Sequence, residues 1–204
     1  MSEPKKPLNR FFVCVYYLVT LVAGILHPVT VIGRENLPEH GALLCPNHNS
    51  NWDPVLVALK VPVNYRLHIM AKKELFCNKV FDWVLRKLGA FPVDRGEGDI
   101  EAVKNALKAI KSGDNLLIFP EGTRVEHEGD LPAKGGVAVI GIRSGAQFVP
   151  VYVEGNKRLF HRTRIIFGQA YRPEATSRRP SPEEVQAIAD EVLRRSYALG
   201  RETR

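Results

Sequence analysis

After Pro28 the sequence alternates between short apolar runs and stretches with helical periodicity, and this alternation constrains the fold more than any other feature. Strands are expected within 30–36, 41–47, 64–71, 89–96, 115–119, 147–155 and 162–169. Helices are expected at 53–60, 78–88, 99–111, 135–145 and from 181 onward. Strands that alternate with helices predict an α/β fold with a mostly parallel central sheet covered by helices. Since no second domain is indicated, residues 28–204 are expected to form a single domain.

The first 27 residues differ from the rest of the chain. Residues 11–26 carry no charge, and His27 and Pro28 interrupt the apolar run. As a helix, this run would be about 24 Å long, which is short of the roughly 30 Å hydrocarbon core of a bilayer. A secretory signal and a buried core helix are two possible interpretations. We favour a third, in which residues 1–27 form an apolar membrane-associating helix that dips into the bilayer or barely crosses it.

The charges that precede this run bear on its orientation. Lys5, Lys6 and Arg10 lie before it, and positive charges favour the cytoplasmic side of a membrane. We therefore expect the protein at the cytoplasmic face of the cell membrane, either as a peripheral or monotopic protein or through a single short span.

Positive charge is concentrated in one part of the chain. The 29 Lys and Arg residues against 22 Asp and Glu give a net charge of +7, and residues 156–179 hold seven of these basic residues with one acid, Glu174. Such a segment predicts an anionic partner: a membrane surface, a phosphorylated substrate or nucleic acid. Cys14, Cys45 and Cys77 are widely spaced and form no C-x-x-C pattern, which favours a reducing compartment and indicates no metal site.

The segment PNHNSNWDP contains the first candidate for catalysis, His48 with Asp53. A histidine paired with a carboxylate has one ring nitrogen held by the acid and the other free to accept a proton. Five positions apart on one helix, the two side chains would diverge by about 140°. They can meet only if His48 lies in the loop and Asp53 in the first turn of the following helix, which is where the prediction places them. The alternative is a loop histidine and an ordinary N-cap aspartate.

The segment FPEGTR, residues 119–124, is the second candidate, because it ends an expected buried strand. Ligands of open α/β sheets bind at the carboxyl ends of strands. There Gly122 would let the backbone approach a ligand, and Arg124 could bind a phosphate through paired N–H groups. Glu121 would orient that guanidinium or bind a hydroxyl. The alternative is an exposed turn with a surface ion pair.

Two more blocks complete the pattern. GAFPVDRG, residues 89–96, carries Arg95 in a polar turn after a short strand, although a solvated arginine is the simpler interpretation of this stretch alone. FVPVYVEG, residues 148–155, is mostly apolar and is expected to shape a pocket. The sequence has no G-x-S-x-G elbow, no G-x-x-x-x-G-K loop and no H-E-x-x-H motif.

Taken together and in this order, the four blocks resemble those of the glycerolipid acyltransferase family, most closely the bacterial 1-acylglycerol-3-phosphate acyltransferases. NHNSNWD resembles the family's His–four residues–Asp box. GAFPVDR, FPEGTR and VPVYVEG resemble its second, third and fourth blocks, and Lys134-Gly135 fits the pattern that follows the third. The resemblance covers about residues 28–170. It implies an acyltransferase domain over residues 28–204.

The resemblance also implies a reaction. His48 would be the general base that removes the proton of the acceptor hydroxyl, and Asp53 would hold and stabilise the imidazole. The acceptor oxygen would attack the thioester of acyl-CoA or acyl-carrier protein without an acyl-enzyme, converting 1-acylglycerol 3-phosphate to phosphatidic acid. No other cofactor is implied. Backbone N–H groups of the His48 loop are the hypothesis for the donors to the developing oxyanion. The expected substrate-binding residues are Arg95, Glu121, Gly122, Thr123, Arg124 and Lys134.

Other functions remain alternatives. The acceptor could be another lysophospholipid or glycerol 3-phosphate itself, and a catalytically silent lipid-binding relative is conceivable. A nucleic-acid-binding module is the alternative from another class, since Phe160, Phe167 and Tyr171 interleave with arginines. These aromatic residues fall in strand-like runs and are expected in the core, so we expect no nucleic-acid partner. The expected partners are a membrane lipid acceptor, the acyl donor and a membrane surface.

Overall fold

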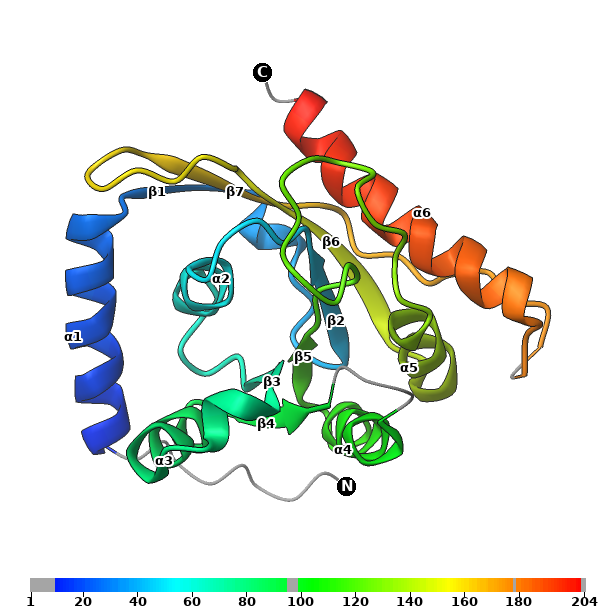
Figure 1. The fold of residues 1–204 in the computed structure, drawn as a ribbon, viewed down its shortest axis with the longest axis horizontal. Coiled ribbons are helices and arrows are strands. Elements are labelled where there is room, and N and C mark those ends of the chain that lie inside the picture. Colours follow the sequence, from blue (N-terminus) through cyan, green and yellow to red (C-terminus); the bar gives the residue numbers. More distant parts are fainter. Residues whose placement is uncertain (1–9, 95–98, 178, 203–204) are drawn as a thin grey trace.

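A seven-stranded sheet with helices on both faces forms the centre of the computed structural model, which describes residues 10–94, 99–177 and 179–202 (Figure 1). The strands are β1 (Val29–Ile32), β2 (Ala42–Pro46), β3 (Leu67–Lys72), β4 (Ala90–Val93), β5 (Asn115–Leu117), β6 (Gln147–Val153) and β7 (Thr163–Phe167). The α-helices are α1 (Arg10–Leu26), α2 (Asp53–Lys60), α3 (Lys79–Lys87), α4 (Ile100–Lys111), α5 (Gly136–Ser144) and α6 (Pro182–Glu202). Two short 3-10 helices are η1 (Arg34–Asn36) and η2 (Lys73–Phe76).

The strands follow the order β1-β7-β6-β2-β5-β3-β4, and the predicted mostly parallel α/β sheet is confirmed. Five adjacent strands, from β6 to β4, run parallel to one another. β7 pairs antiparallel with β6, and β1 pairs parallel with β7. The connection from β6 to β7 has no crossover helix, so the chain can only return antiparallel beside β6.

The first strand ends with the apolar run that predicted it. It ends at Ile32, because Gly33 adopts a left-handed backbone with φ of +73° and η1 follows. A Cβ atom at Gly33 would lie 2.1 Å from the Phe167 carbonyl oxygen. The close approach of this backbone to β7 therefore requires glycine.

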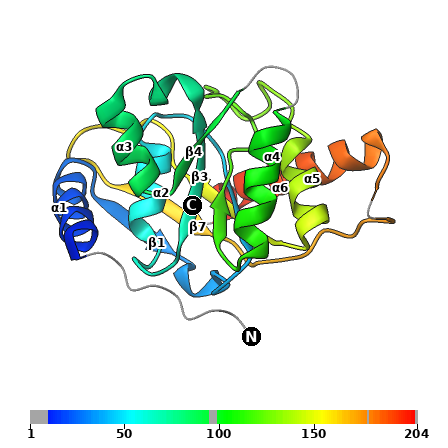
Figure 2. The same cartoon turned by 90° about the horizontal axis from the view of Figure 1, so that it is seen from below.

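Alternate side chains of the central strand β2 enter two separate cores. Leu43 and Cys45 pack among residues of α4, α5 and α6, whereas Ala42 and Leu44 pack among residues of α2, β6 and β7. In Figure 2, α4, α5 and α6 lie on one side of the sheet, and α1, α2 and α3 lie on the other. Because all four side chains are fully buried, β2 is held on both faces and its carboxyl end has a fixed position.

The helix α1 packs against α2 and leaves much of its surface open (Figure 1). The Tyr16 hydroxyl donates to the carbonyl oxygens of Leu59 and Val61, each at 3.2 Å, and Ala23 and His27 are buried. Among the described side chains of α1, six large apolar ones are exposed, so the interpretation of this segment as a buried core helix is wrong. They are Tyr17, Leu18, Val19, Leu21, Val22 and Ile25. Among the described residues, no helix is both long and apolar enough to cross a bilayer.

Two glycines of α5 allow a direct test of how this helix packs on the sheet. In Gly141→Ala the new Cβ would lie 1.8 Å from Cε1 of Phe148, which is fully buried and cannot swing away. We expect this variant to lose about 1–3 kcal/mol of unfolding free energy, measured by urea denaturation. Gly136→Ala is the matched control, because no atom lies within 4 Å of its Cβ position. It should be neutral or stabilising, and equal stability of the two variants would contradict the packing.

Candidate active site

The asparagine side chain that follows β2 continues the sheet by one step before the chain turns away. Asn47 Nδ2 donates to the Val153 carbonyl oxygen at 3.0 Å, and Asn47 Oδ1 accepts from the Val153 N–H at 2.7 Å. The side chain thus takes the place of a backbone pairing partner for β6. The next residue, His48, therefore leaves the carboxyl edge of the sheet in a fixed direction.

His48 and Asp53 are in contact, as their placement in loop and helix predicted. Nδ1 of His48 lies 2.9 Å from Oδ2 of Asp53, the first residue of α2. The same oxygen accepts the backbone N–H groups of Asn49 and Ser50, each at 2.7 Å. Both members of the pair are buried, and within the described residues His48 Nε2 has no hydrogen-bond partner. This nitrogen is consequently the one available to a substrate proton.

A lysine that the sequence analysis counted only as part of the basic segment lies behind this pair. Nζ of Lys157 is 2.6 Å from Oδ1 of Asp53, and the Lys157 side chain is 2% exposed. Burial favours the neutral acid and so opposes a low pKa for Asp53, but the hydrogen bond with His48 and the Lys157 charge outweigh burial and lower that pKa. Burial also lowers the pKa of Lys157, against the attraction of Asp53.

Glu121, in the turn after β5, supports the His48 backbone. Its Oε2 accepts the His48 N–H at 2.6 Å, and its Oε1 accepts the hydroxyl of Tyr197, on α6, at 2.5 Å. Burial raises the pKa of Glu121 to about 7, against the lowering effect of these hydrogen bonds. The Phe119 ring lies 4.1 Å from the imidazole, measured between centroids. These contacts favour a positioning role for Glu121, and Tyr197 is a further residue that the sequence analysis missed.

The remaining predicted substrate-binding residues form the open side of the same turn. Gly122 has φ of +70°, and a Cβ atom there would lie 3.0 Å from Cγ of Lys134, so the lysine stem passes directly over the glycine. The side chains of Thr123, Arg124 and Lys134 are exposed. The turn therefore offers two cations and a hydroxyl to solvent beside the histidine loop. Arg95, also predicted for this site, lies outside the described residues.

The hypothesis that the His48 loop supplies the oxyanion donors is not supported. The backbone N–H of His48 donates to Glu121, and those of Asn49 and Ser50 donate to Asp53. All three groups are engaged within the protein because they hold the two carboxylates in place. These three N–H groups are therefore not available to the thioester oxygen.

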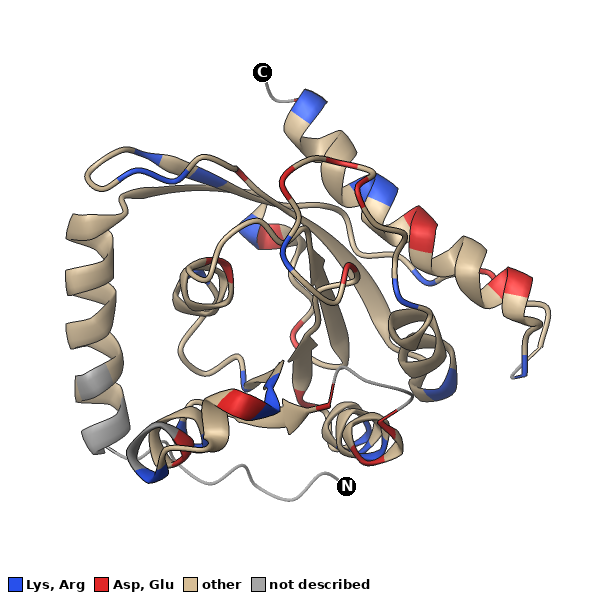
Figure 3. Ribbon diagram, viewed as in Figure 1, with Lys and Arg blue, Asp and Glu red and all other residues tan. Residues whose placement is uncertain are grey.

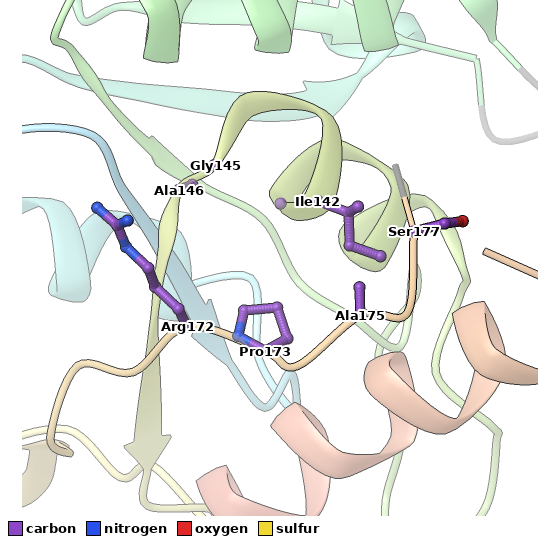
Figure 4. A pocket seen from close by; sticks show the side chains of 8 residues that line it. Ile142, Gly145, Ala146, Arg172, Pro173, Ala175 and Ser177 are labelled. Atoms are coloured by element: carbon purple, nitrogen blue, oxygen red, sulfur yellow. The ribbon is translucent and has the colours of Figure 1, made fainter. Parts of the chain in front are cut away.

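A hollow lies at the opposite edge of the sheet (Figure 4). It has a volume of about 360 Å³ and is lined by Gly145 and Ala146, at the amino end of β6, together with Arg172 and Ala175 among others. None of the described site residues lines it. It is therefore separate from the histidine loop.

A second histidine–aspartate pair also lies at this opposite edge. Nε2 of His68, near the start of β3, is 3.0 Å from Oδ2 of Asp114, which precedes β5. The side chain of His68 is one-third exposed, and Arg66 lies 3.6 Å from the other carboxylate oxygen. A His–Asp contact is thus not unique to the His48 loop, but only the His48 pair stands at the carboxyl ends of the parallel strands.

The aromatic residues of the basic segment are only partly in the core. Phe167 is buried, and Tyr171 is half-buried with its ring beneath the guanidinium of Arg195 at 4.0 Å. Phe160, in contrast, is 64% exposed in the loop between β6 and β7. The expectation of core positions is therefore confirmed for Phe167 and wrong for Phe160. Tyr171 is intermediate, since it is half-buried and packs against the core.

Comparison with known proteins gives one consistent answer. A family model described as acyltransferase matches residues 28–154. The chain is 33% identical over 176 residues to a 1-acyl-sn-glycerol-3-phosphate acyltransferase of Bacillus subtilis, covering 84% of this chain and 87% of that relative. It is 32% identical over 195 residues to the protein of the same name from Streptococcus pneumoniae, covering 93% and 72% of the two chains.

The fold has a counterpart among solved structures. The crystal structure of the 1-acyl-sn-glycerophosphate acyltransferase from Thermotoga maritima superposes with a TM-score of 0.72 at 22% sequence identity, covering 98% of this chain and 85% of that one. At this identity the likeness concerns the fold. Together with the match over residues 28–154 and the sequence relatives, it leads to one conclusion: the chain belongs to the acyltransferase family.

Proposed function

We propose that this acyltransferase moves a fatty acyl group from an acyl thioester to the free hydroxyl of 1-acylglycerol 3-phosphate, giving phosphatidic acid for phospholipid biosynthesis. The observation that carries the proposal is the buried His48–Asp53 pair, 2.9 Å apart, with the second imidazole nitrogen unengaged by the described residues. The names of the Bacillus and Streptococcus relatives support the choice of acceptor.

The catalytic pair performs the proton transfers. Oδ2 of Asp53 accepts a hydrogen bond from the Nδ1–H of His48, which leaves Nε2 as the basic nitrogen. Nε2 takes the proton of the acceptor hydroxyl as its oxygen attacks the thioester carbonyl. The C–S bond then breaks, the ester forms, and the thiolate leaves with the proton returned by the imidazolium. The acceptor's own hydroxyl replaces the nucleophilic serine of a protease, so no acyl-enzyme is needed.

The exposed turn beside the pair binds the glycerol phosphate. Arg124 and Lys134 supply positive charge, and a guanidinium matches the geometry of phosphate oxygens. Thr123 adds a hydroxyl, and Gly122 lets the backbone approach the ligand. We assign Arg95 to the same site by its place in the second sequence block.

A membrane supplies the acceptor, and the surface of the protein suits one. Residues 1–27 serve as the membrane-associating segment, and residues 28–204 form the acyltransferase domain. In Figure 3 the part of α1 whose side chains are described carries no charged residue, while basic residues gather in the loop between β6 and β7. Phe160 in that loop donates its N–H to the Leu26 carbonyl oxygen at 2.7 Å, which places the exposed Leu159 and Phe160 beside the end of α1. Apolar side chains flanked by cations favour the interface of the cytoplasmic leaflet.

One assay tests the proposed reaction. Purified protein is incubated with 1-acylglycerol 3-phosphate and a panel of acyl-CoA and acyl-carrier-protein donors, and parallel reactions contain glycerol 3-phosphate or another lysophospholipid. Phosphatidic acid should be the main product, with no further cofactor added. Faster esterification of another acceptor would replace the proposed substrate, and the donor panel decides between CoA and carrier protein.

His48→Ala should lower kcat by about 10³-fold or more, because the base is lost. His68→Ala is the matched control, since His68 also pairs with an aspartate but at the other edge of the sheet. Its turnover should be unchanged. Both variants are compared in the phosphatidic-acid assay after thermal unfolding has verified the fold. Near-normal turnover of His48→Ala would exclude the proposed base.

Arg124→Ala should raise the KM for the lysophospholipid about ten-fold or more and leave kcat less affected, because the lost contact is made to the phosphate. Arg143→Ala removes an equally exposed arginine from α5 and serves as the control. Initial rates over a range of acceptor concentrations give both constants. If the KM stays at the wild-type value, Arg124 does not bind the acceptor.

A further inference from the structure

Lys157 is a buried cation at the carboxyl edge of the sheet, four residues beyond the end of β6. Its side chain is 2% exposed, whereas lysines are almost never buried unless they are paired. Removing an ammonium group from water is costly, and the surrounding groups must compensate for it. A chain that needed only a link between β6 and β7 could use an uncharged residue at this position.

Three oxygen atoms surround the ammonium group: two accept its hydrogen bonds, and the third, on Asp53, forms an ion pair with it. Oδ1 of Asp53 lies at 2.6 Å, Oδ1 of Asn49 at 2.5 Å and the carbonyl oxygen of Glu154 at 2.7 Å. Asn49 is held in turn, since its Nδ2 donates to the Val153 carbonyl oxygen at 3.2 Å. The lysine therefore ties the end of β6 to both the histidine loop and the catalytic carboxylate.

The two oxygens of Asp53 have different tasks in this arrangement. Oδ2 faces His48 and the backbone N–H groups of the loop, and Oδ1 faces Lys157. Because both oxygens of the Asp53 carboxylate are held, this group cannot rotate away from the imidazole. The positive charge on its far side also offsets part of the negative charge that acts on His48.

We propose that Lys157 is a positioning residue of the acyl transfer, which fixes Asp53 against His48 and balances its charge, so that the buried unit is a His48–Asp53–Lys157 chain. This inference rests on the proposed function. It extends the pair by a residue from a distant part of the sequence.

Charge balance has a consequence for the pH at which the enzyme works. The Lys157 charge offsets part of the negative charge of Asp53 that acts on the imidazole. The other ionisable groups around the pair are Glu121, which binds the His48 N–H, and Glu154, whose carboxylate is paired with Arg164. Both are negative when ionised and oppose the effect of Lys157. Loss of Lys157 leaves the Asp53 charge uncompensated, which favours the imidazolium, so we expect the acidic limb of the activity profile to move to higher pH.

Lys157→Met tests the inference through two readouts, the acidic limb of the kcat/KM profile and the NMR titration of the His48 imidazole. The resonance is assigned by its loss in His48→Ala. We expect kcat to fall about 10- to 100-fold. Both the limb and the titration midpoint should move up by about one pH unit. Lys111→Met, which removes an exposed lysine at the end of α4, is the matched control and should change neither.

A charge-retaining variant separates charge from packing. Lys157→Arg should lower kcat but keep the limb and the midpoint at their wild-type pH. The inference is overturned if a folded Lys157→Met leaves both at the wild-type pH, or if Lys157→Arg shifts them as far as methionine does. Should Lys157→Met fail to fold, Lys157→Gln carries the same expectation, because its amide is uncharged but can still bond to Asn49.

The NMR titration needs no turnover, so the two proposals can fail separately. The wild-type protein could transfer no acyl group while the His48 titration still shifts in Lys157→Met. That result would refute the proposed function and retain the inferred coupling of Lys157 to the His48–Asp53 pair. An active enzyme without the shift would refute only the role of Lys157.

Discussion

The buried carboxylate of Asp53 is the group on which the arrangement of the site depends. It binds the imidazole of His48, two N–H groups of the connecting loop and the ammonium of Lys157. A carboxylate that is fully removed from water is stable in its charged form only with such partners. The same contacts that satisfy this charge also give the loop its shape, so stability and catalytic geometry have one physical origin.

The fold brings four distant parts of the chain to the site around this carboxylate. Strand β2 delivers the histidine loop, β5 delivers Glu121, β6 leads to Lys157, and α6 supplies Tyr197. Parallel neighbours place their carboxyl ends at one edge, and the crossover helices leave that edge open to a ligand. The exposed apolar side of α1 and the basic loop beside it form the surface that we propose binds a lipid membrane.

Local sequence patterns were sufficient for most of the fold and for the first members of the site. Each strand and α-helix in the described residues lies within or close to its predicted range, because hydrophobic periodicity and turn residues are local properties. The His48–Asp53 contact was also predictable, since a loop followed by the first helical turn brings positions five apart together. The signal for Glu121 was its place shortly after a buried strand.

Lys157 and Tyr197 could not be predicted, because their partners are more than 70 residues away along the chain. Lys157 lies in a run of cations, and charge alone does not distinguish a buried lysine from a solvated one. Its position four residues after an apolar strand, at the edge expected for the site, was the only hint. The end of β1 and the exposure of Phe160 likewise depend on contacts with distant backbone, namely Phe167 and Leu26.

The rate of acyl transfer by Asp53→Asn, measured in a single turnover with saturating substrates, examines the catalytic pair most directly. The asparagine is nearly isosteric and its carbonyl oxygen can still accept from the loop, but it cannot hold the imidazole in the tautomer with a basic Nε2. The rate should fall by at least about 10³-fold while the protein remains folded. A rate within a few-fold of the wild type would contradict the role of the His48–Asp53 pair.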